Sequence, residues 1–445
     1  MTLTLLSAGS NAHGQLAHSS NEDSHTFLPC QFLGSPANKL PSNATQLLDV
    51  ATGANHTLIL LQLSPVNDKP GGRRIREVWG CGDGRAGQLG RKYQEFLDVA
   101  RASGKPFQTD VFRKLELDLE AEGLEGYEPK AISAGWETSY ITLSTSNGNM
   151  SDVLVSFGSD DFGDLGIGGL AKRKGKEARK ELNRIDFSHL LPDGALVSIV
   201  GLSANQHHVV VHIRAGEKGW VVGWGAARHG QIGVPPTVGS KPAPTVGKPQ
   251  LMMVEDMNDP FVSLSVGSQH SVLLRSSGKL VGLGSNRKGQ LDVVHLENVK
   301  AVSCTWNGTF ALVEKDTTWR VHGTGSNTHG QLGRGIGSSN EGQSEHIHFR
   351  SMSDGAQPVL LSCGTEHVFV SLTMEREDIC GSQSDQVWGW GWNEHGNLGM
   401  GHTDDRHEPV RIFPKESGEA GRLAGIWTGS GTSWILWRTN NVLVS

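Results

Sequence analysis

The stretch WGWGWNEHGNLGMG, residues 388–401, places three tryptophans and five glycines within fourteen positions. Helices and regular strands disfavour so much glycine, because glycine loses more backbone entropy on folding than any other residue. The segment GWNEHGNL within this stretch has glycine, four further residues, glycine, an amide or acid, and then leucine or isoleucine. This pattern, here called the Gly loop, occurs seven times: GSNAHGQL from Gly9, GDGRAGQL from Gly82, GSDDFGDL from Gly158, GAARHGQI from Gly225, GSNRKGQL from Gly284, GSNTHGQL from Gly325 and GWNEHGNL from Gly391.

A second motif alternates strictly with the Gly loops. It begins with a small residue, usually glycine, and leads into a β-branched or aromatic run. Its seven copies are GANHTLIL from Gly53, GWETSYITL from Gly135, ANQHHVVV from Ala204, GSQHSVLL from Gly267, TWNGTFAL from Thr305, GTEHVFV from Gly364 and GSGTSWIL from Gly429. Two motifs that alternate seven times indicate a repeat architecture.

Short apolar segments with a period of two, such as VLVSFG and KLVGLG, precede the Gly loops, which indicates strands. Each repeat therefore spans roughly 60 residues and about four strands, too few to bury both faces of its own sheet. Sheets of this size that stack radially close into an all-β propeller. The N-terminal LTLLSAG and the C-terminal WILWRTNNVLVS both resemble propeller strands, so we expect the two ends to share one blade and close the ring.

Composition supports an all-β fold and limits the function classes. Glycine contributes 58 of 445 residues, and the formal net charge of −6 gives no general attraction for nucleic acid. The five cysteines are widely spaced without a CxxC pair, which indicates reduced thiols, mostly in the core. MTLTLLSAGSN lacks the features of a signal peptide, and no apolar stretch is long enough to cross a membrane. We therefore expect a soluble intracellular protein.

The two-part repeat resembles that of the regulator-of-chromosome-condensation family over essentially the whole chain. That resemblance implies one seven-bladed β-propeller over residues 1–445. The chain departs from the family's minimal propeller by loop insertions at about 91–128, 171–190 and 235–250. Finer features resemble the fungal alpha-tubulin-suppressor, or killer-toxin-insensitivity, branch: the short fifth repeat, SAGWETSYITL, ANQHHVVV, CTWNGTFAL and VWGWGWNEHGNLG. This finer resemblance implies a heterodimer with a small CSL-type zinc-finger protein of diphthamide synthesis. It also implies support for Elongator-dependent modification of wobble uridine in tRNA, with indirect contact to Elongator.

The motifs favour a scaffold over a catalytic or cofactor site. A phosphate-binding P-loop needs lysine and then serine or threonine after its second glycine, whereas every Gly loop continues with an amide or acid and an aliphatic residue. We expect Trp390 or Trp392 to lie at a rim. The histidines His56, His207, His270 and His367 are each one per repeat, too far apart to share a zinc ion, so we expect hydrogen bonds to the neighbouring blade's backbone. We predict no cofactor, no metal and no enzymatic activity.

Two charged stretches lie in the insertions. AKRKGKEARKELNRID, residues 171–186, has helical propensity and is interpreted either as a solvated helix or as a localisation or RNA-contacting element. DVFRKLELDLEAEGLEGYE, residues 110–128, is acidic, and we expect it to be a surface excursion.

Positions just after the second motif's first residue differ from repeat to repeat, as a binding face allows and a scaffold does not need. Exposed tryptophan is typical of binding hot spots, so we predict a partner surface comprising Trp136, Glu137, Trp306 and Glu366. The alternative is that both tryptophans pack between blades.

We therefore predict a non-catalytic binding module, in the cytoplasm and possibly also the nucleus, with no direct nucleic-acid or membrane contact. One alternative is a guanine-nucleotide exchange factor for a Ran-like GTPase, although the chain has no basic N-terminal tail. Another is an adaptor for a different client, such as tubulin or a ubiquitin ligase.

Overall fold

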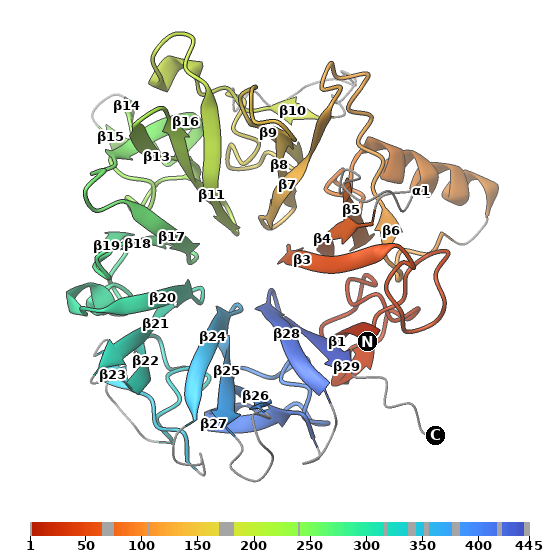
Figure 1. Ribbon diagram of the computed structural model, residues 1–445, viewed down its shortest axis with the longest axis vertical. Helices are drawn as coiled ribbons and strands as arrows, with labels where there is room; N and C mark the ends of the chain where they lie inside the picture. Colours follow the sequence, from red (N-terminus) through yellow and green to blue (C-terminus); the bar gives the residue numbers. More distant parts are fainter. Residues whose placement is uncertain are drawn as a thin grey trace.

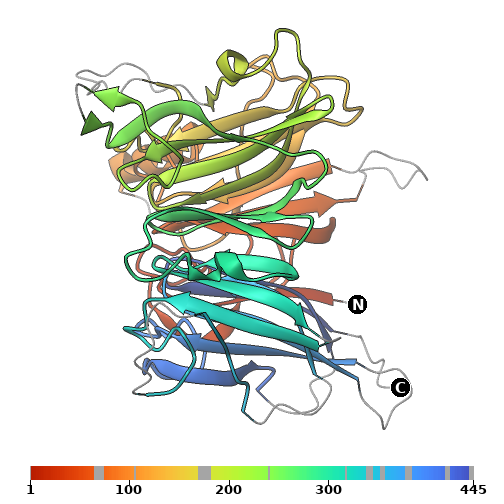
Figure 2. The same cartoon turned by 90° about the vertical axis from the view of Figure 1, so that its left-hand side faces the viewer.

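The computed structural model describes residues 2–64, 75–104, 107–168, 182–238, 241–315, 318–336, 344–350, 356–375, 383–415 and 421–439. Within these ranges the strands form seven antiparallel blades around a central axis (Figure 1). In a view from the side, the strands of each blade run across the thickness of the disc (Figure 2). The predicted all-β, seven-bladed β-propeller is confirmed.

The blades are numbered here in chain order. Blade 1 contains β3 (Ala44–Thr52), β4 (His56–Leu63), β5 (Ile75–Gly82) and β6 (Arg113–Lys114). Blade 2 contains β7 (Tyr127–Ala134), β8 (Thr138–Thr145), β9 (Val153–Gly158) and β10 (Asn183–Arg184). Blade 3 contains β11 (Val197–Asn205), β12 (His208–Ala215), β13 (Lys218–Ala226) and β16 (Thr245–Val254).

Blade 4 has three strands in the described part of the chain: β17 (Phe261–Val266), β18 (His270–Arg275) and β19 (Leu280–Gly284). Blade 5 contains β20 (Val299–Cys304), β21 (Gly308–Lys315), β22 (Thr318–Gly325) and β23 (Glu345–His346). Blade 6 contains β24 (Gln357–Cys363), β25 (His367–Glu375), β26 (Gln383–Gly391) and β27 (Arg406–Phe413). The expectation of about four strands per repeat thus fails at blade 4, where the short 3-10 helix η2 (Asp292–His295) contacts β19 instead.

Blade 7 is built from both ends of the chain. It combines β28 (Gly421–Thr428) and β29 (Thr432–Thr439) with β1 (Thr2–Gly9) and β2 (Ser24–Pro29). β1 pairs with β29 along its full length, from Thr2 opposite Thr439 to Gly9 opposite Thr432. The predicted closure is confirmed, while the expected strand at VLVS, residues 442–445, lies outside the described residues.

The core lies between neighbouring blades. Between blades 1 and 2, for example, Leu60 and Val78 pack with Ile132, Ile141 and Val155, all of them buried. Burial of aliphatic side chains on both faces of each sheet explains why one blade cannot fold alone. The stacking of blades therefore supplies the hydrophobic stabilisation of the whole ring.

Each Gly loop is shaped by its first glycine and by its amide. Gly325 has φ +117°, and a Cβ on it would lie 2.3 Å from the carbonyl oxygen of Asn307 in the second motif of the same blade. In the loop from Gly9, the side chain of Gln15 accepts a hydrogen bond from His13 N (2.9 Å), and Leu16 is fully buried. The predicted scaffold roles of glycine, amide and leucine are thus observed in the loop geometry.

The predicted rim tryptophans differ in their environment. Trp390 is fully buried, and its Nε1 donates to the carbonyl of Gln331 in the preceding blade's Gly loop (2.7 Å). Trp392 is half-buried on the Gly-loop side. The interpretation of this stretch as scaffold fits Trp390, because it ties blade 6 to blade 5.

The insertions have these structures. Residues 91–128 contain helix α1 (Arg91–Ser103), which packs Tyr93 and Leu97 onto blade 1. The acidic stretch 110–128 is more than the expected surface excursion, because Phe112 within it is fully buried. Residues 235–250 contain the hairpin β14 (Thr237–Val238) and β15 (Lys241–Pro242) before β16.

The charged stretch 171–186 is described only from residue 182. Residues 171–181 of the expected helix lie outside the described part of the chain. The helix expectation is wrong for Asn183 and Arg184, which form β10 because they pair with Ser156 and Val155 of β9. The 3-10 helix η1 (Ser188–Leu190) follows.

Candidate functional site

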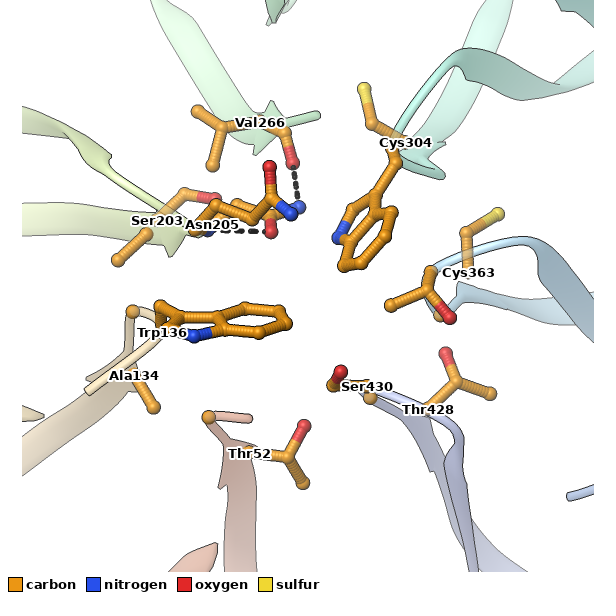
Figure 3. Close-up of a pocket in the computed structure, with 18 of the residues that line it drawn as sticks. Thr52, Ala134, Trp136, Ser203, Asn205, Val266, Cys304, Cys363, Thr428 and Ser430 are labelled. Carbon is orange, nitrogen blue, oxygen red and sulfur yellow. Dashed lines mark hydrogen bonds between the residues drawn. The ribbon is translucent and has the colours of Figure 1, made fainter. Parts of the chain in front are cut away.

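The second-motif turns of all seven blades surround a pocket at one mouth of the central channel. This pocket has a volume of about 180 Å³. Figure 3 shows Trp136, Asn205, Cys304, Cys363 and Ser430 around it. The Gly loops lie on the same face, because each follows a strand that ends beside the second motif of its own blade. Ser285 N, for instance, donates to the carbonyl of Gln269 (2.9 Å). We call this side of the propeller the loop face.

Trp136 and Trp306 meet across this pocket, although they come from blades 2 and 5. Their ring centroids are 5.8 Å apart with an interplanar angle of 46°. Both side chains are half-buried, and both line the channel mouth, not the packed space between blades. Within the described part of the chain neither indole nitrogen has a hydrogen-bond partner, so each N–H can donate to a ligand.

Backbone hydrogen bonds between neighbouring blades hold the tryptophan pair in place. Trp136 N donates to the carbonyl of Gln206 in blade 3 (2.9 Å), and Ala54 N in blade 1 donates to the carbonyl of Trp136 (2.9 Å). Trp306 N likewise donates to Thr365 of blade 6 (2.8 Å). The pair is therefore preorganised, because these bonds to three neighbouring blades fix its backbone.

The two predicted glutamates differ in role. The carboxylate of Glu366 accepts hydrogen bonds from Asn307 Nδ2 (2.9 Å) and Gln331 Nε2 (2.7 Å), both in blade 5. Burial raises the pKa of Glu366, partly offset by these two donors. Its contacts therefore join blades 5 and 6, whereas Glu137 is half-buried, with no hydrogen-bond partner for its carboxylate among the described residues.

Asn205 is a channel residue outside the predicted set. Its Nδ2 donates to the carbonyl of Val266 in blade 4 (3.0 Å). It occupies the place that glycine has in most other copies of the second motif, because β12 begins at His208 and not at His207. Aligning the motif on the start of the apolar run would have shown this one-residue shift.

The same one-residue shift changes which histidine of blade 3 is equivalent to those of the other blades. His208, not His207, is equivalent to His56, His270 and His367, because each of these four begins the second strand of its blade. Each Nε2 lies at hydrogen-bond distance from a hydroxyl of the next blade: Ser139 for His56 (2.9 Å), Ser271 for His208 (3.1 Å), Thr309 for His270 (3.0 Å) and Ser433 for His367 (2.9 Å). The expected contact to the next blade is present, but the partner of each Nε2 is a side-chain hydroxyl and not the expected backbone group.

These histidines are uncharged at neutral pH and connect neighbouring blades through hydrogen bonds. The Ser139 hydroxyl donates to the carbonyl of Gln88 (2.6 Å), so it accepts from His56, which places the ring proton on Nε2. Burial lowers the pKa of His56 and His270 to about 4 and that of His208 and His367 to about 3. Within the described residues no group of three or more His, Cys, Asp or Glu is arranged to hold a metal.

The cysteines near the channel are buried thiols. Burial raises the pKa of Cys304 to about 11 and that of Cys363 well above its ordinary value. Both are free, as are Cys30 and Cys81, while Cys380 lies outside the described residues. A separate finding concerns membranes: no helix in the described ranges is long and apolar enough to span a bilayer.

Comparisons with known proteins agree with this repeat. The family model described as the regulator of chromosome condensation repeat matches residues 384–431, and a second model with the same description matches residues 261–290. The chain is 24% identical to the ultraviolet-B receptor of Arabidopsis thaliana over 96% of this chain and 82% of that protein. It is also 24% identical to the secretion-regulating guanine nucleotide exchange factor of Mus musculus, with the same two coverages.

Among solved structures, human WBSCR16 superposes with a TM-score of 0.70, covering 99% of this chain and 100% of that one at 17% identity. This similarity concerns the fold alone. The chain is thus a seven-bladed β-propeller in which two segments, residues 261–290 and 384–431, match the regulator-of-chromosome-condensation repeat.

Proposed function

We propose that this propeller is a non-catalytic binding module whose loop face docks a small protein partner. The observation that carries the proposal is the tryptophan pair, Trp136 and Trp306, which is half-buried at the channel mouth with both indole N–H groups unoccupied in the described structure. Tryptophan in a preformed, partly desolvated position is the residue type most typical of a binding hot spot.

The surroundings of the pair support docking. Its backbone is fixed by hydrogen bonds to neighbouring blades, so little conformational entropy remains to be lost on binding. The buried histidines hold the blades together and the buried cysteines stay protonated, which leaves them in structural roles. A rigid ring with a central aromatic anchor fits a partner that inserts one apolar or aromatic side chain.

We propose that the partner is a small CSL-type zinc-finger protein, in a one-to-one complex. This identity rests on the resemblance of SAGWETSYITL, ANQHHVVV and CTWNGTFAL to the fungal branch of the family. In this proposal, docking orients the metal of the partner for electron transfer. The complex then supports diphthamide synthesis on elongation factor 2 and Elongator-dependent modification of wobble uridine, in the cytoplasm and also the nucleus.

The test is calorimetry of the purified protein against the CSL zinc-finger protein, with Trp306→Ala as the variant. We expect micromolar affinity or tighter and a loss of more than ~1 kcal/mol in Trp306→Ala, because truncation removes an aromatic anchor. Phe96→Ala is the control, since Phe96 is exposed on α1 at the outer edge of blade 1.

Far-UV circular dichroism should show that both variants are folded. No binding by the unmodified protein would reject the CSL partner. If folded Trp306→Ala binds with unchanged affinity, the CSL partner is supported, but the tryptophan pair is not part of the interface.

A second candidate is exchange-factor activity on a Ran-like GTPase. It is favoured by the similarity to the mouse secretion-regulating guanine nucleotide exchange factor, which spans 96% of this chain and 82% of that protein. The assay is release of labelled GDP from Ran, with and without the propeller. Acceleration would support this candidate, and an unchanged release rate would reject it.

A further inference from the structure

The charged side chains of the loop face are distributed unevenly around the ring. Adjacent Gly loops of blades 3 and 4 carry Arg228, Arg287 and Lys288, all exposed, while blade 2 carries Glu137 and Asp161 on the same face. The net charge of the whole chain is −6, so this basic region is a local feature. We call Arg228, Arg287 and Lys288 the basic patch.

The two loops of the basic patch are in direct contact. A Cβ placed on Gly284, at the start of the blade 4 loop, would lie 3.0 Å from Cα of Gln231 in the blade 3 loop. His229 follows Arg228 in the blade 3 loop, and burial, then Arg287 and Arg228, lower its pKa. The cations therefore form one cluster, although Arg228 and Arg287 are far apart in sequence.

The basic patch has no internal counter-charge. In the described ranges no carboxylate lies within 4 Å of the side-chain nitrogens of Arg228, Arg287 or Lys288. By contrast, Arg85 in the Gly loop of blade 1 forms an ion pair with Asp83 (2.7 Å). Clustering like charges without acids lowers stability, so a cluster of this kind is typical of a surface that meets an anionic partner.

The basic patch is continuous with the tryptophan pair. Trp306 accepts a hydrogen bond at its carbonyl from Ser268 N (2.9 Å), and Gln269, the next residue, accepts one from Ser285 N, two residues before Arg287. In blade 3, Ala226 N donates to the carbonyl of His207 (2.6 Å), two residues before Arg228. The aromatic pocket and the cations thus belong to one surface.

We propose that this surface binds an acidic segment of a partner protein, with its carboxylates on the basic patch and an apolar side chain on the tryptophan pair. The inference rests on the proposed docking function and specifies the chemistry of the docked segment. Arginine suits it because its planar guanidinium can bind a carboxylate through two parallel N–H donors.

An acidic protein segment fits better than a nucleic acid. A polyphosphate chain gains affinity from many distributed cations, whereas this face offers one cluster followed by the acids Glu137 and Asp161 of blade 2. A short acidic segment can contact the basic patch and end before blade 2. One apolar residue within it is enough to reach the pocket of about 180 Å³.

The experiment compares two double variants of the full chain. Arg228→Glu with Arg287→Glu reverses the basic patch, and Lys218→Glu with Lys279→Glu is the matched control. The control changes the same net charge in the same two blades, at exposed turns on the opposite face. The probes are the CSL zinc-finger protein, a labelled peptide of six glutamates around one leucine, and a labelled single-stranded oligonucleotide.

We expect the patch variant to bind both the zinc-finger protein and the acidic peptide at least about tenfold more weakly, while the control binds like the unmodified protein. Affinity for the peptide should also fall as salt rises from about 50 to about 300 mM, because the contact is exposed. The acidic peptide should compete with the zinc-finger protein for the loop face.

The outcomes of this experiment distinguish a failure of the proposed docking function from a failure of the acidic-segment inference. If the zinc-finger protein binds the patch variant as tightly as the unmodified protein, the acidic-segment inference is overturned and the docking function stands. If the zinc-finger protein does not bind at all, the proposed partner fails, and the peptide then decides the inference by itself. A peptide that does not bind, or an oligonucleotide that displaces it and loses affinity in the patch variant, overturns the inference.

Discussion

At the scale of single residues, four histidines connect blades without carrying charge. His56, His208, His270 and His367 each bind a hydroxyl of the next blade, and burial lowers their pKa values to between about 3 and about 4. The Thr138, Gly308 and Thr432 positions begin the equivalent strands in the remaining blades, so histidine is not required for the fold. The histidines instead make the stability of the ring sensitive to acid.

The sign of this pH dependence follows from the lowered pKa values. Below pH 6.5 the unfolded chain binds protons on these histidines while the folded protein does not, so the free energy of unfolding should fall from pH 6.5 towards pH 4. Each histidine with a pKa of about 4 contributes a loss on the order of 2–3 kcal/mol. Denaturant unfolding at a series of pH values would measure it.

The variant for this prediction is His270→Gln, which can place an amide donor near Thr309 without titrating. The difference in unfolding free energy between pH 7 and pH 4.5 should be about 2 kcal/mol smaller than in the unmodified protein. An identical difference in the two proteins would show that His270 does not contribute.

At the scale of elements, serine side chains join three pairs of neighbouring inner strands. Ser133 accepts a hydrogen bond from Ala204 N, Ser265 from Cys304 N and Ser303 from Cys363 N, each across to the next blade. Every inner strand also contains a bulge, where one residue has no partner in the second strand: Leu48, Lys130, Val200, Val262, Lys300, Val359 and Ala424. Bulges increase twist locally, which suits strands that converge on a channel.

Replacing Ser303 tests the serine contacts. Ser303→Ala should lower the free energy of unfolding by about 1 kcal/mol, because Cys363 N–H loses its acceptor. Ser203→Ala is the matched control, since Ser203 has the equivalent position and its hydroxyl has no partner in the described structure. Equal stability of the two variants in denaturant unfolding would contradict a role for these contacts.

At the scale of the whole molecule, blade 7 closes the ring by pairing the two ends of the chain. Leu5 in β1 and Leu436 in β29 are both buried in the same cluster, which continues into blade 1 through Leu61 and Trp79. Because each blade contacts its neighbours, an open ring would expose apolar faces and strand edges on both sides of the gap. Closure should therefore control the stability of every blade.

Deleting residues 1–9, which removes β1, should lower the melting temperature by at least about 10 °C or leave the chain insoluble, because β29 keeps β28 but loses its other neighbouring strand along its full length. Scanning calorimetry would measure the effect. Adding a synthetic peptide of residues 1–30 should restore part of the stability, whereas a peptide of the same composition in reversed order should not. A truncated chain that melts like the complete one would contradict closure as the source of stability.

The sequence by itself determined the repeat, the all-β class, the seven blades and the pairing of the two ends, because these depend on local patterns that recur along the chain. It also selected Trp136 and Trp306 as unusual members of their motif. Their meeting across the channel was decided by the tertiary structure, since they lie 170 positions apart in blades that are not neighbours.

The remaining features also depend on contacts between blades. The hydrogen bonds of Glu366 to Asn307 and Gln331, and the contact between the loops that carry Arg228 and Arg287, both arise where two repeats meet. A repeat pattern read along the chain describes each blade separately. Such a pattern cannot predict the site, because the site is formed by the packing of blades against one another.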